Sequence, residues 1–205
     1  MYQQNNGTMN LKEERIDNYI LRLFYDECPS DPREDSNLTK MVCFHKRYSL
    51  GDDHDLKSDD FDGWREMEEY ITRTEDPIVI KSLYLYDHGG ITIGTRPFGD
   101  RWDSGQIGFV YIRKEDVRNN FSIKRCGQRI TERCNVLLDG EVEVYDKYLR
   151  GEVYGYDIVR VNKCEFGHEH EEGLERCGDY LDEEQCIHDG MVTLEWFRKN
   201  EQVEV

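Results

Sequence analysis

The sequence predicts an α+β fold with a mainly antiparallel sheet, two or three helices and an acidic C-terminal insertion. Short runs of alternating or β-branched apolar residues indicate strands, and two longer segments with apolar residues three to four positions apart indicate helices. The two kinds of segment do not alternate as they do in a doubly wound sheet. Since 205 residues is an ordinary domain size, we expect a disordered polar arm over residues 1–10 and a single domain over residues 11–205.

The first expected elements are two strands and a short helix. Residues 19–25 and 41–48 read as strands, with a proline-rich turn, CPSDPREDSN, between them. Ser58 has the side chain of an N-cap, and apolar residues recur at helical spacing after it. We therefore expect a helix over about residues 59–73, which ends before Pro77.

The central segment, LYLYDHGGITIGTRPFGDRWDSGQIGFVYI, predicts three antiparallel strands over residues 78–86, 91–93 and 105–112. We expect alternating apolar side chains to bury one face of these strands and Trp102 to pack over the loop that joins the last two. The alternating residues are Leu83, Leu85, Ile91, Ile93, Ile107, Phe109 and Tyr111.

The clearest helix pattern lies further along the chain. Apolar residues at helical spacing predict a helix over residues 128–149, which Gly151 ends. A strand is expected over residues 153–161. Residues 164–189 read as an acidic insertion, and residues 191–197 read as a last strand or short helix.

The composition limits the classes of partner and the location. The chain has 44 acidic against 27 basic residues, a formal charge of −17. Such a surface repels the phosphates of nucleic acid and of membranes, so we expect neither as a direct partner and expect a basic protein instead. No run approaches the ~18 apolar residues of a membrane helix, and the N-terminal residues lack the apolar region of a signal peptide, so we expect a cytoplasmic protein. The seven cysteines, an odd number in a chain of this size, are expected to be reduced.

The C-terminal cysteines and histidines are the densest set of possible zinc ligands. No CxxC pair is present, and twelve residues separate Cys164 from Cys177, so the spacing does not match a zinc site. We therefore expect no metal and no cofactor. The set is Cys164, His168, His170, Cys177, Cys186 and His188.

An alternative cleft lies at the ends of the central strands. A histidine oriented by a carboxylate beside a Cys or Ser is the skeleton of nucleophilic catalysis. No nucleophile elbow surrounds Ser104, and no phosphate-binding glycine motif is present. Turn residues that bond to their own backbone explain the pattern as well, so an enzyme stays an alternative. The residues of the alternative cleft are Asp87, His88, Arg101, Trp102, Asp103, Ser104 and Gln106, with Cys43, His45, Asp52 and His54 as possible neighbours.

Two runs of carboxylates suggest a partner-binding surface. Such runs are usually solvated surface, but duplex DNA carries one charge per about 1.7 Å, and carboxylates at a similar spacing can enter a channel lined with Lys and Arg. The sequence thus predicts an acidic, phosphate-mimicking surface. Its residues are Asp52, Asp53, Asp55, Asp59, Asp60, Asp62, Glu169, Glu171, Glu172, Glu175, Asp179, Asp182, Glu183 and Glu184. The basic residues between positions 113 and 133 are expected to neutralise nearby carboxylates.

Three blocks of the sequence carry a resemblance: MVCFHKRYSLGD, the central segment given above, and EVEVYDKYLRGEVYGY. They resemble a family of phage and mobile-element proteins with no assigned activity. The resemblance implies a phage origin, and the acidic composition is similar to that of several phage inhibitors of restriction and CRISPR enzymes. We therefore expect a phage accessory protein that binds and inhibits a nucleic-acid-handling defence enzyme, of the anti-CRISPR or anti-restriction type. The alternative is a small hydrolase, or a sponge for a nucleotide signal, that uses the alternative cleft.

Overall fold

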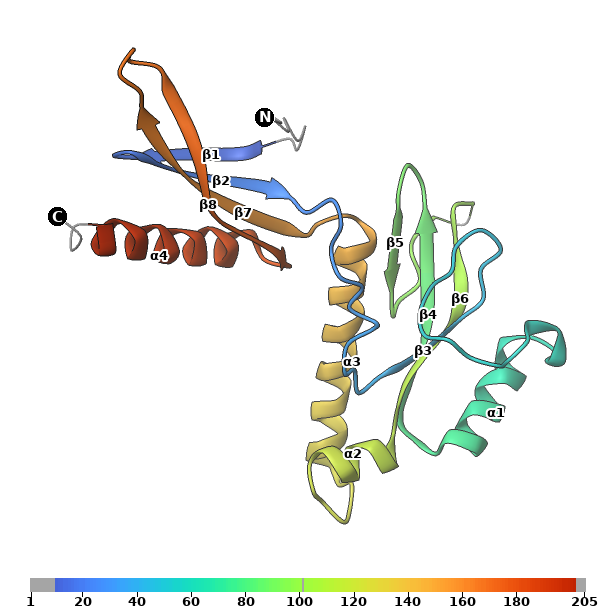
Figure 1. Cartoon of the computed structure of the whole chain (residues 1–205). Coiled ribbons are helices and arrows are strands. Elements are labelled where there is room, and N and C mark those ends of the chain that lie inside the picture. The colour runs from blue at the N-terminus through green and yellow to red at the C-terminus, as the bar shows by residue number, and fades with distance from the viewer. Residues whose placement is uncertain (1–9, 101, 202–205) are drawn as a thin grey trace. The chain divides into compact units, whose positions relative to one another are not determined.

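The computed structural model describes residues 10–100 and 102–201, and it divides the chain into two compact units. Unit 1 comprises residues 1–30 and 151–205, and unit 2 comprises residues 31–150 (Figure 1). Where we expected one domain over residues 11–205, the chain forms two units, and unit 2 is inserted between the two halves of unit 1. The expected disordered arm falls almost wholly outside the described residues.

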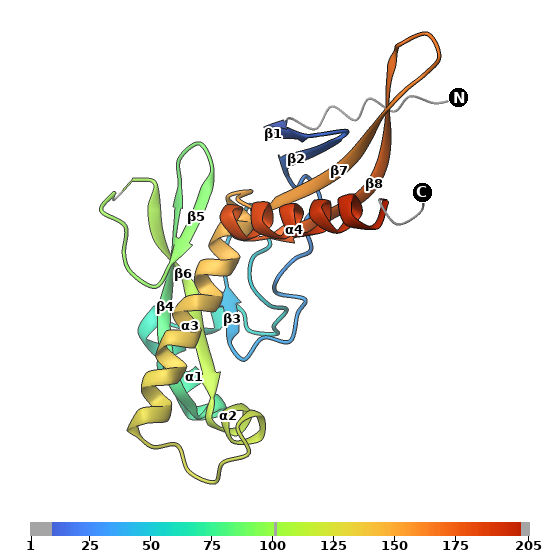
Figure 2. The same ribbon diagram turned by 90° about the vertical axis from the view of Figure 1, so that its left-hand side faces the viewer.

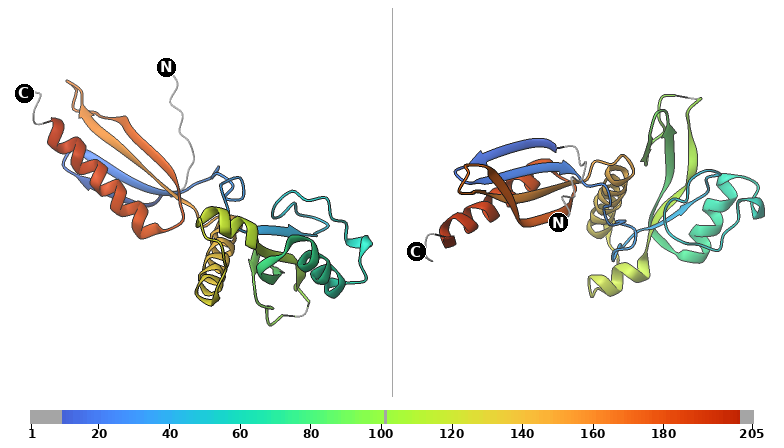
Figure 3. Two further views of the ribbon diagram at one scale, coloured as in Figure 1. Left: turned by 90° about the horizontal axis from the view of Figure 1, so that it is seen from below. Right: turned by 45° about the horizontal axis from the view of Figure 1, so that its top comes forward.

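Unit 1 is a four-stranded antiparallel sheet with one helix on it. The strand order is β1-β2-β7-β8. The elements are β1 (Asn10–Ile16), β2 (Tyr19–Tyr25), β7 (Tyr154–Lys163), β8 (Glu169–Tyr180) and α4 (Glu183–Glu201). Figures 2 and 3 show α4 lying along one face of this sheet. Since successive strand residues point to opposite faces, Tyr19, Leu21 and Leu23 pack toward Cys186 and Leu194 of α4.

Unit 2 is a second four-stranded antiparallel sheet, and it has helices on both faces. The strand order is β3-β6-β4-β5. The elements are β3 (Lys40–Cys43), the 3-10 turn η1 (Ser58–Asp60), α1 (Trp64–Glu75), β4 (Pro77–Asp87), β5 (Ile91–Gly94), β6 (Ser104–Arg113), α2 (Lys114–Asn120) and α3 (Gln128–Leu149). Figure 2 shows α3 and α1 on opposite sides of this sheet. One apolar cluster joins the sheet to α3, and another joins its opposite face to α1.

The predicted α+β class with mainly antiparallel strands is confirmed, with two sheets and, in the described part of the chain, four α-helices in place of two or three. The long helix has the predicted bounds. The helix expected from residue 59 begins at Trp64, because a 3-10 turn and Gly63, with a φ of 86°, precede it. The region read as an acidic insertion forms β8 and the start of α4, and the last expected strand or short helix is part of α4.

The central strands bury both faces of the sheet. A register shift between the pairs Leu83–Gly108 and Tyr84–Gln106 places an extra residue, Ile107, in β6. Such a bulge changes which face each following residue points to. Ile107 therefore lies in the cluster toward α3, whereas Phe109 and Tyr111 lie toward α1, and the expectation of one buried face is wrong.

Candidate functional site

The structure brings together two residues of the alternative cleft. His88 follows β4, Asp103 precedes β6, and the pairing of these strands places His88 Nδ1 2.9 Å from Asp103 Oδ2. The side chains are 71% and 40% exposed. Asp87 instead receives a hydrogen bond from Arg47 and lies 3.5 Å from the Tyr48 hydroxyl. The pair is thus an open surface contact.

The other residues of this constellation do not join the pair. The Ser104 hydroxyl donates to the carbonyl of Asp100, and the Gln106 amide donates to the carbonyl of Gly108. The Asp100 carboxylate accepts the backbone N–H groups of Trp102 and Asp103 at 2.7 and 3.1 Å, which lowers its pKa. Arg101 lies outside the described residues.

Trp102 is 95% exposed, so the prediction that it packs over the loop is wrong. The backbone N–H groups of Trp102 and Asp103 hold the turn by donating to the Asp100 carboxylate, and this arrangement needs no packed indole. Trp102 therefore contributes no core contact to the central strands.

The possible neighbours of the alternative cleft are buried or make contacts within unit 2. Burial raises the pKa of the Cys43 thiol to about 12, so this group is not a thiolate at neutral pH. His54 Nε2 lies 3.0 Å from the Cys43 carbonyl oxygen, and the His45 ring stacks on Tyr48. None of these groups is paired with His88 as a nucleophile or a second base.

Asp52, which we predicted to face a partner, is a structural residue. Arg33, whose side chain is 4% exposed, donates to both Asp52 oxygens at 2.9 Å, and the Met41 N–H donates to Asp52 at 2.8 Å. Arg33 also reaches the carbonyl of Thr39. A carboxylate with these partners is not available to another protein.

Several carboxylates of β8 and the turn after it are also paired within unit 1. Glu169 accepts two hydrogen bonds from Arg15 at 2.9 and 3.0 Å, and Glu171 accepts two from Arg22 at 2.5 and 2.8 Å. Glu172 accepts a hydrogen bond from Asn162 at 3.1 Å. Asp179 binds Ser30 through its backbone N–H and hydroxyl, and Asp182 accepts the Gln185 N–H at the start of α4. Glu175, Glu183 and Glu184 remain exposed.

In the described ranges, no group of three or more His, Cys, Asp or Glu side chains is placed to hold a metal ion. Cys164 and His170 lie at the β7–β8 turn, and their hydrogen bond lowers the pKa of Cys164. Cys177 and Cys186 instead pack in the core of unit 1, where burial raises the pKa of Cys186 to about 12. The seven cysteines are all unpaired thiols.

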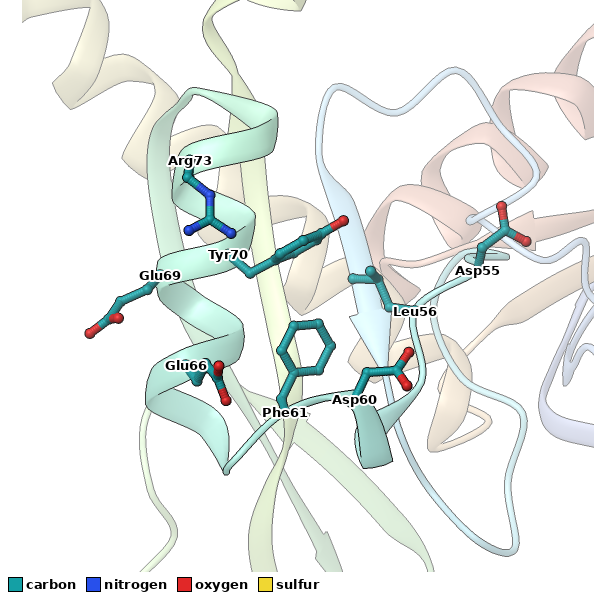
Figure 4. A pocket seen from close by; sticks show the side chains of 8 residues that line it. All are labelled: Asp55, Leu56, Asp60, Phe61, Glu66, Glu69, Tyr70 and Arg73. Atoms are coloured by element: carbon teal, nitrogen blue, oxygen red, sulfur yellow. The ribbon is translucent and has the colours of Figure 1, made fainter.

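A pocket of about 450 Å³ lies beside α1, in the middle of the early acidic run. Figure 4 shows its lining from three segments: the loop before η1, η1 with the residue after it, and the outer face of α1. The lining residues are Asp55, Leu56, Asp60, Phe61, Glu66, Glu69, Tyr70 and Arg73. The four α1 residues of the lining are successively three, one and three positions apart, so they lie on one face of the helix.

The pocket combines aromatic rings with carboxylates. The rings of Phe61 and Tyr70 meet edge to face with centroids 5.3 Å apart, and the Arg73 guanidinium lies 5.6 Å from the Tyr70 ring centroid. Glu66 also accepts the Asp62 N–H at 2.6 Å, which fixes the approach of the η1 segment to α1. A site with four carboxylates and two rings can hold a cation. Asp55 and Asp60 were among the predicted binding residues, whereas the contribution of α1 was not predicted.

The basic residues at the α2–α3 end of unit 2 divide into two groups. Arg113 pairs with Asp116 and Glu75, and Lys114 pairs with Asp76, as expected for internal neutralisation. The Arg133 guanidinium lies 4.6 Å from the Phe121 ring centroid. The exposed cations of this end are Arg118, Lys124, Arg125, Arg129 and Arg133.

Comparison with known protein families, curated proteins and solved structures finds no match to this chain. Among the described residues, no helix has the length and apolar character required to cross a membrane. The sites described above are therefore the observations that bear on function.

Proposed function

We propose that the chain is a phage accessory protein that binds a basic, nucleic-acid-handling defence enzyme of its host, such as a CRISPR effector or a restriction enzyme, and inhibits it in the cytoplasm. The observation that carries the proposal is the acidic aromatic pocket beside α1. Its carboxylates and rings suit the side chains that a nucleic-acid channel presents, above all arginine.

The chemistry of the pocket favours a guanidinium. Arginine binds carboxylates through a planar fork of N–H donors and also stacks on aromatic rings. Arg73 already lies near the Tyr70 ring from within the chain. A second guanidinium from a partner would meet Asp60 and Glu69 in the same cavity. Cation–π contacts contribute ~0.5–2 kcal/mol each, so the carboxylates and the rings together can anchor one partner residue.

The surroundings of the pocket support the phosphate-mimicking part of the proposal. Asp53, Asp59 and Asp62 are exposed and extend the row of carboxylates beyond the cavity. Four of the predicted partner-binding carboxylates are bonded within the chain and are removed from the proposed surface: Asp52, Glu169, Glu171 and Glu172. We therefore assign the mimicking surface to the region around α1 rather than to β8. A cluster of like charges speeds the approach of an oppositely charged partner.

Phage plating tests the proposal. Host cells that carry an active CRISPR effector or restriction enzyme would express the chain, and wild type should restore plating against at least one system. Asp60→Asn with Glu69→Gln should abolish this protection. Asp35→Asn with Glu115→Gln removes the same charge at two exposed carboxylates outside the pocket lining and outside the row of carboxylates beside it, and it should retain protection. Failure of wild type across such a panel, or equal loss in both double variants, would refute the proposal.

A second candidate function rests on the His88–Asp103 contact. A histidine oriented by a carboxylate is a component of a hydrolase site or of a site for a nucleotide signal. The open geometry and the absence of a paired nucleophile in the described residues make this the less supported alternative. His88→Ala should leave protection unchanged, and a folded His88→Ala protein that had lost all protection would favour this second function.

A further inference from the structure

An apolar groove runs along the outer side of α4. Its volume is about 500 Å³, and it is lined by His188, Met191, Val192, Glu195, Trp196 and Lys199. Val192 and Trp196 are 57% and 59% exposed. Exposed apolar side chains that adjoin on one helix face mark an interaction surface more often than isolated ones do.

The groove lies on the side of α4 that faces away from the sheet. Cys186, Gly190 and Leu194 recur every four residues and pack on β2 and β7, and a Cβ at Gly190 would lie 2.8 Å from Leu21. Val192 lies two residues after Gly190 and two before Leu194. Two residues correspond to a rotation of about 200° around an α-helix, so Val192 lies on the opposite side of α4. Val192 and Trp196 therefore point away from the core of unit 1, whereas Met191 lies at the edge of the groove and also packs against that core.

We propose that this face binds the α4 helix of a second copy of the chain, antiparallel across a two-fold axis near Val192. Residues related by such an axis are those equally far from Val192 in opposite directions. Val192 then meets its own counterpart, and Trp196 meets His188 of the other copy. A two-fold interface of this kind needs a self-complementary surface.

The charges on α4 supply that complementarity. The first turn carries Glu183 and Glu184, and the last turn carries Arg198 and Lys199. Arg198 is held by Asp17 and Glu195, which leaves Lys199 at the edge of the groove. In the antiparallel arrangement Lys199 lies beside Glu184 of the other copy at both ends of the interface. A parallel arrangement would instead place like charges together.

The size of the surface sets the expected affinity. A helix of 19 residues is about 28 Å long, so one helix pair gives an interface at the small end of the range for specific contacts. The two copies also repel each other, since each carries a charge of −17. We therefore expect a dimer with a dissociation constant of roughly 1–10 µM.

Sedimentation velocity of the full chain, from about 1 to about 100 µM, tests the proposal. Wild type should pass from monomer to dimer. Trp196→Ala and Val192→Glu should weaken the dimer at least ~10-fold, because the first removes both contacts between Trp196 and His188 and the second places two carboxylates against each other at the axis. Trp102→Ala, which removes another exposed tryptophan, is the matched control and should sediment as wild type.

A charge exchange tests the antiparallel geometry. Lys199→Glu alone and Glu184→Lys alone should each be monomeric, because each creates two like-charge contacts. A mixture of the two variants should form a heterodimer, because every contact then joins opposite charges. Three results would overturn the proposal: a wild-type monomer at about 100 µM, equal weakening by Trp102→Ala, or a monomer in which hydroxyl-radical footprinting finds Trp196 protected by another part of the same chain.

Discussion

Unit 2 buries its sheet between helices on both faces, whereas in the described part of unit 1 a helix covers one face of the sheet. On the opposite face of unit 1 the buried cluster is small: Ile20, Val159 and Val161. Arg22 lies in the same row, and its side chain is only 17% exposed because it bonds to Glu13 and Glu171. Arg176 similarly lies 4.0 Å from the Phe24 ring centroid.

Acidic residues have different uses in the two units. Unit 1 has 20 acidic and 8 basic residues, and several of the basic side chains are bonded to carboxylates of β1 and β8 as a charged cover over apolar strands. Unit 2 has 24 acidic and 19 basic residues, and its helices cover the core instead. Of the carboxylates that line the pocket beside α1, Glu66 accepts the Asp62 N–H and Glu69 has one exposed ion pair with Arg65 at 3.8 Å, so neither serves as cover for the core.

The largest effect is expected where unit 2 depends on the close approach of two strands. A Cβ at position 108 would lie 1.9 Å from the Val42 carbonyl oxygen, so Gly108→Ala forces β3 away from β6. The cost should be roughly 3 kcal/mol or more. Urea denaturation measures it, and hydrogen exchange should localise the loss to unit 2. Gly105→Ala, whose Cβ would meet nothing within 4 Å, should stay within ~0.5 kcal/mol of wild type.

The charged cover of unit 1 should have an intermediate effect. Arg22→Ala removes the hydrogen bonds to Glu13 and Glu171 and takes a cation from Asp157, its neighbour on β7. Loss of both the stem packing and the charge should cost about 2 kcal/mol. The matched control is Arg65→Ala, since Arg65 makes one exposed ion pair of 3.8 Å and should contribute under ~0.5 kcal/mol. Equal thermal shifts for the two variants would show that the cover contributes nothing.

A smaller effect, of opposite sign, is expected at Asp157. Burial raises the pKa of this carboxyl even though Arg22 and Arg176 flank it, so its ionised form costs stability once the pH rises above the ordinary value of about 3.9. Glu171 behaves in the opposite way. Its hydrogen bonds to Arg22 lower its pKa, so its contribution is present above about pH 4.3 and is lost as the pH falls through the lowered value.

Asp157→Asn should therefore stabilise unit 1 at pH 7 by a few tenths of a kcal/mol, since the site is only partly buried. The gain should vanish below about pH 3.9, where the wild-type carboxyl is protonated. Thermal denaturation of both proteins from pH 3 to 7 measures the difference. A destabilised variant at pH 7 would mean that the attraction to Arg22 and Arg176 outweighs the cost of burial.

Elements with their own apolar pattern could be predicted from the sequence. The α3 helix and the strands β2, β4, β5, β6 and β7 are such elements. The β1 strand, NLKEERI, is nearly all exposed and is held by pairing with β2, so no alternation of burial marks it. The α4 helix contains Gly190, a poor helix former that allows contact with Leu21, and this weakens the helix signal in the sequence. Such elements depend on partners that are distant in the sequence.

Only part of the candidate site could be predicted, because the rest depends on contacts between residues that are distant in the sequence. The high density of acidic residues marks the early run in the sequence, and Asp55 and Asp60 of this run do line the pocket. Composition does not distinguish them from Asp52, whose pairing with Arg33 requires the folded loop. Glu69 and Tyr70 fall on the outer face of α1, and their approach to η1 depends on a 3-10 turn. The predicted helix over residues 59–73 included part of that turn.

The smallest effect is expected at Trp102, in the loop between β5 and β6. If the stability of unit 2 resides in its two-sided core, Trp102→Ala should change the free energy of unfolding by less than ~0.5 kcal/mol, because the indole is almost fully exposed. Trp64→Ala is the contrasting variant. Trp64 packs against Phe44 and Phe109 with ring centroids 6.2 and 6.0 Å apart, so its loss should cost about 3 kcal/mol or more. Urea denaturation of both variants measures these two changes. If the two tryptophans contributed equally, the loop would be part of the core, and the stability of unit 2 would not reside in its covered sheet alone.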